Sequence, residues 1–263
     1  MVPTTPAVTA SQGGHVPLPC WLTSAPIAHR GCYDAVEHPE NSLPAFRRAI
    51  ELGAPFEFDV QLTSDDEPIV VHDRDFSRVA GTCSAPVADL DLAAVRALRI
   101  GPADLPVPTL DDVLSLVDGA VPLLLDLRRW KAGNAKLERA VADRLRGYRG
   151  QTAVQSFDPI AVRRLRKLAP HVPVGQASGS LQSAGKLVGT LGRMMLSNAI
   201  TRPDFINYEL AELPSRAVSF WRGRGIPVIA FTAHSPEEEL LARRFADNFL
   251  FSGYLPGHYR TST

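Results

Sequence analysis

Histidines, carboxylates and arginines stand at the C-terminal ends of short apolar runs in this sequence. The residues concerned are His29, Arg30, Glu57, Asp59, His72, Asp126 and Arg128. In a barrel of parallel strands such ends meet on one face, and active sites lie on that face. Unrelated surface residues need not gather at the same end of successive strands, so the pattern indicates a single site.

Glu57 and Asp59 are two positions apart in the run Phe56–Val60. On a strand their side chains point to the same side. Two carboxylates so close repel each other unless a cation or a proton lies between them, and a hard divalent cation such as Mg²⁺ or Ca²⁺ prefers oxygen ligands. Asp126 could supply a third carboxylate from another strand. Taken alone, the pair could instead be a solvated edge-strand face or an ion-pair partner of arginine.

His72 and Arg30 also have ordinary explanations when each is considered alone. An isolated histidine is often a structural residue with satisfied hydrogen bonds, and an isolated arginine is often a surface charge. Their place beside the carboxylates favours a chemical role. Histidine transfers protons near neutral pH, and arginine offers a fork of donors that matches phosphate geometry.

Alternating apolar runs and amphipathic segments predict a parallel sheet with helical crossovers. Nine candidate strands are present where an eight-stranded barrel needs one fewer. The connection from Phe56–Val60 to Ile69–His72 is too short for a helix, and Asp75–Pro108 is predicted to be a small insertion on one rim. Helix starts are expected at Ser42, Thr109 and Ser235, in the last two cases with acidic residues three positions later.

The composition is that of an ordinary globular protein. The chain has 263 residues, 45% of them hydrophobic and 21% charged, and its formal net charge is zero, so nothing favours a nucleic-acid partner or a polybasic membrane patch. No apolar stretch is long enough to span a membrane. Three cysteines without paired spacing indicate reduced thiols and a cytoplasmic location. Residues 1–25 are expected to form a flexible leader before a barrel domain at 26–260.

Several motifs together carry a family resemblance. They are His29-Arg-Gly31, Pro39-Glu-Asn-Ser42 with Ala45-Phe46, Glu57-Phe-Asp-Val60, Val70-Val-His-Asp73, Pro108–Leu114, Leu125–Arg128, Gln155–Phe157 and Phe231-Thr232. Their order and spacing resemble the signature of the glycerophosphodiester phosphodiesterase family, a branch of the phospholipase-C-like barrel phosphodiesterases. The resemblance spans roughly residues 27–256, and its first third is the most specific.

The resemblance implies a single TIM-type (β/α)8 barrel that hydrolyses glycerophosphodiesters to glycerol 3-phosphate and an alcohol. His29 and His72 resemble the acid/base pair. Glu57 and Asp59 resemble metal ligands, and Asp126 occupies the place of a third. Arg30 and Arg128 would bind the phosphate. The implied cofactor is Mg²⁺ or Ca²⁺, and the implied partner is a small glycerophosphodiester.

Six positions depart from the family pattern. Asp126 stands where Glu is usual and Arg128 where Lys is usual; Ser252-Gly253 replaces a Thr-Asp pair, and Phe231 and His234 replace Trp and Asn. These changes leave two alternatives open. One is a lysophospholipase D-like enzyme, which an apolar channel near Leu181–Ile200 would favour. The other is a barrel that binds phosphodiesters without turnover.

Overall fold

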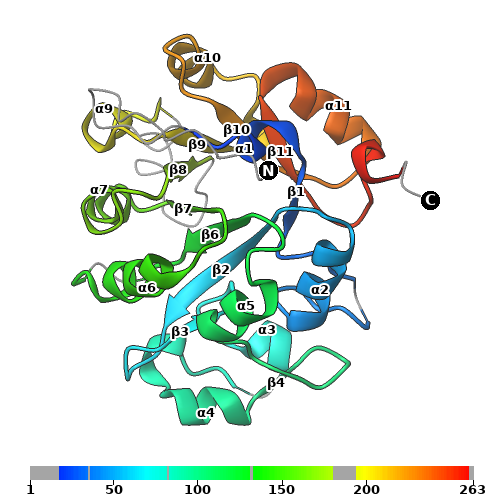
Figure 1. Cartoon of the computed structure of the whole chain (residues 1–263), viewed down its shortest axis with the longest axis vertical. Helices are drawn as coiled ribbons and strands as arrows, with labels where there is room; N and C mark the ends of the chain where they lie inside the picture. The colour runs from blue at the N-terminus through cyan, green and yellow to red at the C-terminus, as the bar shows by residue number, and fades with distance from the viewer. Residues whose placement is uncertain (1–17, 35, 82, 131–132, 180–193, 261–263) are drawn as a thin grey trace, which may run out of the picture.

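The computed structural model describes residues 18–34, 36–81, 83–130, 133–179 and 194–260. Within these residues nine strands form one sheet in the order β1-β11-β10-β9-β8-β7-β6-β2-β3, and a further pairing of β1 with β2 closes it. All neighbouring pairs are parallel except β2 with β3. The predicted α/β class and single TIM-type barrel are confirmed (Figure 1).

The strands that make up the barrel are short. Their bounds are β1 (Ile27–His29), β2 (Phe56–Leu62), β6 (Leu123–Leu127), β7 (Thr152–Ser156), β8 (Val174–Ser178), β9 (Phe205–Glu209), β10 (Val228–Ala233) and β11 (Asn248–Phe251). The ninth candidate strand is β3 (Pro68–Val70), which forms an antiparallel hairpin with β2. Its tight turn is closed by a hydrogen bond from the Thr63 amide to the Glu67 carbonyl at 3.0 Å. A hairpin needs no crossover helix, which explains both the short connection and the extra strand.

Helices surround the barrel (Figure 1). They are α2 (Leu43–Glu51), α5 (Leu110–Val117), α6 (Lys136–Gly147), α7 (Pro159–Leu168), α9 (Asn198–Thr201), α10 (Arg216–Arg222) and α11 (Pro236–Phe245), with single 3-10 turns at η3 (Leu210–Glu212) and η4 (Gly257–Tyr259). The three predicted starts are confirmed, since Ser42, Thr109 and Ser235 are the N-caps of α2, α5 and α11. On the outer side of β2, Phe56 stacks on Phe46 of α2 with ring centroids 4.6 Å apart.

The connection after β3 folds as a small insertion with its own core. It contains α3 (Ser77–Ala80), η1 (Val87–Asp89), α4 (Leu92–Ala97) and the hairpin β4 (Arg99–Ile100) with β5 (Leu105–Pro106). Its buried apolar cluster consists of Ile69, Val71, Phe76, Val87, Val95, Ile100 and Val107. This matches the predicted insertion at Asp75–Pro108, whose α3, α4 and β4 lie at the lower side of the molecule in Figure 1.

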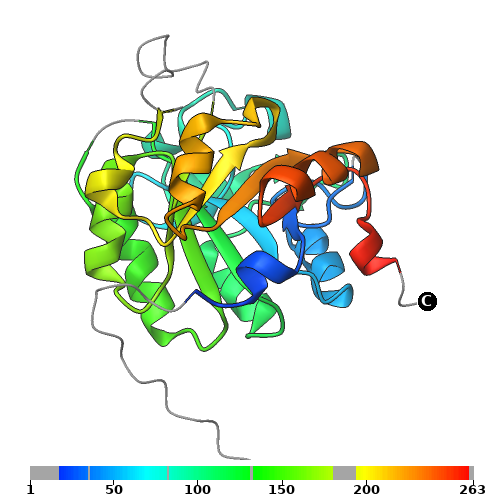
Figure 2. The same ribbon diagram turned by 90° about the horizontal axis from the view of Figure 1, so that it is seen from above.

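One end of the barrel interior is closed by α1 (Trp21–Ser24), the blue helix against the strands in Figure 2. Trp21 and Leu22 are buried among inward-facing residues from the starts of the strands, and the Asn248 side chain donates to the carbonyls of Leu22 and Ala25 at 3.0 and 2.7 Å. Residues 18–25 of the predicted leader therefore lie against the barrel. The prediction for residues 1–17 lies outside the described residues, as does most of the segment Leu181–Ile200.

Two further predictions concern membrane-spanning helices and the state of the cysteines. Within the described residues, no helix combines the length and the apolar character needed to cross a bilayer. Cys20, Cys32 and Cys83 are all free thiols. The cytoplasmic location stays a prediction.

Candidate active site

The site lies directly above the apolar layer of the barrel interior. Residues of that layer include Ile27, Leu124, Ala153, Phe205 and Leu250. Side chains two positions further along a strand point to the same side. On these strands they are polar: His29, Asp126, Gln155, Asn207 and Ser252. The interior-facing side chains are therefore apolar near the starts of the strands and polar two residues later, at the C-terminal ends.

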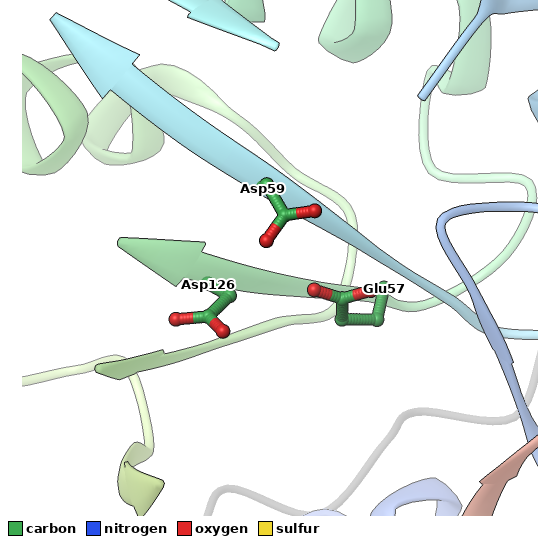
Figure 3. Close-up of side chains that lie close together, drawn as sticks. All are labelled: Glu57, Asp59 and Asp126. Carbon is green, nitrogen blue, oxygen red and sulfur yellow. The ribbon is translucent and has the colours of Figure 1, made fainter. Parts of the chain in front are cut away.

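Glu57, Asp59 and Asp126 form a compact carboxylate cluster. One oxygen from each lies within 4.8 Å of the others, and all three residues are almost fully buried. Asp59 and Asp126 are register partners on the neighbouring strands β2 and β6. Figure 3 shows Glu57 and Asp59 on the same side of β2, facing Asp126 on β6.

The three carboxylates of this cluster differ in the direction of their pKa shifts. Burial raises the pKa of Glu57 well above its usual value, and the charges of Asp59 and Asp126 raise it further. Burial also raises the pKa of Asp126 to about 7, although Arg128 opposes this. Asp59 differs, because Arg30, His72 and Arg128 outweigh its burial and hold its pKa below the usual value.

These residues fit a divalent cation. The donor set consists of carboxylate oxygens, which hard cations prefer. Asp126 Oδ1 is buried and accepts no hydrogen bond from any described residue. A buried acceptor without a partner is costly, and a cation at this place would satisfy it while removing the mutual repulsion.

His72 is held in one tautomer. Its Nδ1 lies 2.7 Å from Asp73 Oδ1, and Arg128 Nη2 lies 2.8 Å from its Nε2. Because a guanidinium can only donate, Nε2 is the acceptor and the ring proton is on Nδ1. Burial lowers the pKa of His72, which favours this neutral ring.

His29 faces the carboxylates from the other side. Its Nε2 lies 3.9 Å from Glu57 Oε2, and its Nδ1 lies 3.0 Å from Ser252 Oγ. Burial and the nearby Arg30 charge lower the pKa of His29 well below its usual value. The ring is therefore neutral, and Ser252 fixes its orientation.

Arg30 is fixed at both its backbone and its side chain. It occupies the left-handed region with φ 57°, a conformation that few non-glycine residues adopt and that often marks a functional site. Its amide donates to Glu57 Oε2 at 3.0 Å, and its guanidinium contacts Glu40 at 2.7 Å and Asp59 at 3.3 Å.

Arg128 borders the cavity from the opposite side. Its guanidinium lies 3.7 Å from Asp59 and 3.6 Å from Asp126. The rings of Trp130 and Phe157 flank it, with centroids 5.6 and 5.5 Å from its central carbon. The structure thus brings all seven sequence-predicted residues around one cavity of about 280 Å³.

Three supporting residues were missed by the sequence reasoning. Asn41 is named in the sequence analysis only as a member of the Pro39–Ser42 motif, but it exchanges two hydrogen bonds with Asp59, at 2.9 and 3.2 Å. Asp73 follows His72 directly, and that adjacency was an available signal. Ser252 was noted only as a departure from a family pattern. His234, considered as an extra polar contact, is exposed, and its amide donates to Glu238 at 2.6 Å, as expected before a helix.

The chain is thus a closed parallel α/β barrel with carboxylates, histidines and arginines gathered at the C-terminal ends of its strands. Comparisons with known proteins give the family. The family model of the glycerophosphoryl diester phosphodiesterase family matches residues 29–247. The chain therefore belongs to the glycerophosphoryl diester phosphodiesterase family.

Individual relatives agree with this. A glycerophosphodiester phosphodiesterase of Caldanaerobacter subterraneus is 33% identical over 163 residues, which is 57% of this chain and 64% of that relative. Two solved structures share the fold. An Oleispira antarctica phosphodiesterase in complex with the product sn-glycerol-3-phosphate has a TM-score of 0.72 and 22% identity, covering 88% of this chain and 93% of the other. A Thermotoga maritima glycerophosphodiester phosphodiesterase has a TM-score of 0.66 and 22% identity, covering 91% and 96%.

Proposed function

We propose that this protein hydrolyses glycerophosphodiesters to glycerol 3-phosphate and an alcohol, and that it does so with a divalent cation. The observation that carries the proposal is the single cavity in which three buried carboxylates, two neutral histidines and two arginines meet. Simple binding of a phosphodiester needs no such pair of neutral histidines. The family match and the relatives' names support the substrate class.

Glu57, Asp59 and Asp126 hold the cation in this proposal. When bound, a Mg²⁺ or Ca²⁺ ion would polarise a phosphoryl oxygen and neutralise the charge that develops on it. Arg30 and Arg128 bind the remaining phosphate oxygens. Arg128 would be released for this role if a bound cation supplied the counter-charge of Asp59 and Asp126. Its guanidinium lies beside the rings of Trp130 and Phe157.

His72 is the base and His29 the acid. Nε2 of His72 has a lone pair directed at Arg128, while its proton is held at Nδ1 by Asp73. Once Arg128 turns to the phosphate, this nitrogen can take the proton of the attacking hydroxyl, whether that of water or of the glycerol. His29 lies across the carboxylates, with Nε2 3.9 Å from Glu57. In this proposal His29 takes up a proton from solvent when the anionic substrate binds and donates it to the oxygen of the departing alcohol, while His72 later releases the proton that it has taken.

The test is release of glycerol 3-phosphate from sn-glycerophosphodiesters, including glycerophosphocholine, with EDTA, Mg²⁺ or Ca²⁺. We expect activity that EDTA abolishes and one of the metals restores. His72→Ala should lower kcat at least about 100-fold, the lower range for loss of general base catalysis. His171→Ala is the matched control, because this histidine is exposed and lies outside the cavity.

Lysophosphatidylcholine belongs in the same assay. Faster release of choline from this lipid than from glycerophosphocholine would replace the proposed substrate with lysophospholipids. Binding of both compounds without turnover under any metal condition would contradict the enzymatic role. The cavity itself favours the smaller substrate, since among its lining residues only Phe157, Phe231 and Leu250 are large and apolar.

A further inference from the structure

A second pocket lies beside the carboxylate cavity, between the insertion and the connection from β6 to α6. Its volume is about 220 Å³, and it shares Arg128 with the cavity. Its lining includes Gln61, Arg74, Arg128, Arg129, Trp130 and Lys136. Because Arg128 borders both spaces, a group bound in one space is adjacent to a group bound in the other.

The border between the two spaces is rigid. Trp130 donates from Nε1 to Gln61 Oε1 at 3.0 Å, and the Gln61 amide donates in turn to the carbonyls of Val71, His72 and Asp73. The Trp130 ring lies against the Arg128 guanidinium and is still 48% exposed. A large aromatic ring fixed at one edge and open at the other is a typical wall for a ligand.

The charged side chains that line this pocket are all positive. Four of its lining side chains are basic and none is acidic. Arg129 is committed to buried Glu138 at 2.5 Å, and Lys136 pairs with Asp66 at 2.6 Å, but that pair is about half exposed and therefore weak. Arg74 has no ion-pair partner within 4.0 Å among the described residues, and its nearest acidic influence is the partly exposed neighbour Asp75. An anion would gain from Arg74 and Arg128, whereas a cation would meet only like charges.

A phosphodiester has two substituents, and the pocket is placed to receive one of them. With the phosphate between Arg30 and Arg128, the departing alcohol can extend past Arg128 along Trp130. We propose that this pocket binds the alcohol part of the substrate and selects alcohols that carry an anionic group, a carboxylate or a phosphate. This inference rests on the proposed function and narrows its substrate class.

The experiment compares three substrates that differ only in the alcohol. In glycerophosphodiesters of glycerol, of glycerate and of glycerol phosphate, the added group is respectively none, a carboxylate or a phosphate. We expect kcat/KM to be about tenfold higher for at least one of the charged alcohols than for glycerol, the size of one charge-assisted hydrogen bond. The two charged substrates distinguish carboxylate from phosphate as the preferred group.

Arg74→Met should remove most of this preference, because kcat/KM should fall much more for the charged substrates than for the neutral one. Arg74→Lys should restore part of it, because the charge returns without the planar fork. Arg146→Met is the matched control, since Arg146 is exposed on α6, outside the pocket. Equal kcat/KM values for all three substrates in the wild type would overturn the inference. An equal loss on all three in Arg74→Met would do the same.

Failure of the proposed function can be distinguished from failure of this inference. Binding of free glycerate and free glycerol is followed by ligand-observed NMR in the wild type and Arg74→Met. One outcome is that no diester is cleaved, but glycerate binds to the wild type, glycerol does not, and Arg74→Met loses this binding. The proposed hydrolysis is then refuted, and the anion-binding pocket is supported. If the diesters are cleaved and glycerate binds no better than glycerol, the function stands and the anion pocket is refuted.

Discussion

At the scale of single residues, Asp126 is a position where the proposed function opposes the stability of the fold. Its carboxylate is buried beside Asp59 and close to Glu57, and Oδ1 has no hydrogen-bond donor among the described residues. Burial raises its pKa to about 7. Such a group destabilises the metal-free fold, as expected of a carboxylate that would serve as a metal ligand.

Asp126→Asn should therefore change stability and metal binding in opposite directions. The amide removes a buried charge, so we expect the Tm in EDTA at pH 8 to rise by about 5 °C, given about 2–4 °C per kcal/mol for a chain of this size. Loss of a ligand should weaken Mg²⁺ or Ca²⁺ binding at least tenfold, since even outer-shell changes cost about 10–100-fold. Differential scanning calorimetry and metal titration measure the two effects. Asp143→Asn, an exposed change on α6, should alter neither; a lower Tm in Asp126→Asn would contradict this account.

Cys32 lies close to the site in sequence but has the properties of a structural thiol. Burial raises its pKa to about 11. Only the thiolate reacts with iodoacetamide, so we expect alkylation of Cys32 at pH 8 to be at least tenfold slower than that of exposed Cys20. Its rate should still rise with each pH unit up to about 10. Mass spectrometry of timed digests measures both rates, and a Cys32 rate that levels off below pH 9 would refute the raised pKa.

At the scale of elements, the insertion is tied to the site by a chain of ion pairs. Arg78 of α3 donates from Nε to Asp73 at 2.5 Å and from its terminal nitrogens to Glu40 at 2.6 and 3.0 Å. Asp73 orients His72, and Glu40 holds Arg30. Through Arg78 the insertion thus fixes two functional side chains, His72 and Arg30.

Arg78→Met tests this positioning role. Without Arg78, Asp73 is free to rotate, and the Nδ1 proton of His72 loses its fixed partner. We expect kcat to fall about tenfold while KM changes less than threefold, because orientation matters most in the transition state. Arg78→Lys should recover part of kcat, and Arg47→Met, an exposed arginine change on α2, should have no effect. Equal kcat in Arg78→Met and wild type would show that the ion pairs are only structural.

The elements also show what could be foreseen from the sequence. Barrel strands and capped helices follow from local patterns, so the runs around Phe56–Val60 and the caps Ser42 and Thr109 were predicted correctly. Ile69–His72 was read as one more barrel strand, because an apolar run does not reveal the direction of its partner. The contacts of Arg78 join residues far apart in the chain, and no local pattern encodes them.

At the scale of the whole molecule, the barrel is divided into an apolar lower half and a charged upper half. The lower half is closed by Trp21 and Leu22 and filled tightly, so that a Cβ on Gly175 would lie 2.2 Å from the Phe205 ring. This dense layer stabilises the fold and gives a rigid base to the site. The upper half concentrates like charges, so the stability of the molecule should depend on whether a cation is bound.

This dependence should vary with pH in a predictable direction. Folded-state pKa values of Glu57 and Asp126 are raised, the latter to about 7, so the metal-free folded state holds protons that the unfolded chain has already released above about pH 4. The free energy of unfolding without metal therefore falls as pH rises through 7. His29 and His72 have lowered pKa values and act in the opposite direction while the unfolded histidines titrate around pH 6.5. This contribution comes from the unfolded chain, so it cancels when the metal-bound and metal-free proteins are compared.

The difference in Tm between the metal-bound and metal-free proteins, measured between pH 6.5 and 8.5, therefore reports on the protonation of the carboxylates. A bound cation requires deprotonated ligands, so its affinity increases over the same range. We expect the difference in Tm between saturating metal and EDTA to grow steadily from pH 6.5 to 8.5, by at least about 5 °C, and to grow much less in Asp126→Asn. A difference that is constant or shrinks with pH in the wild type would mean that these carboxylates are not the groups that bind the metal.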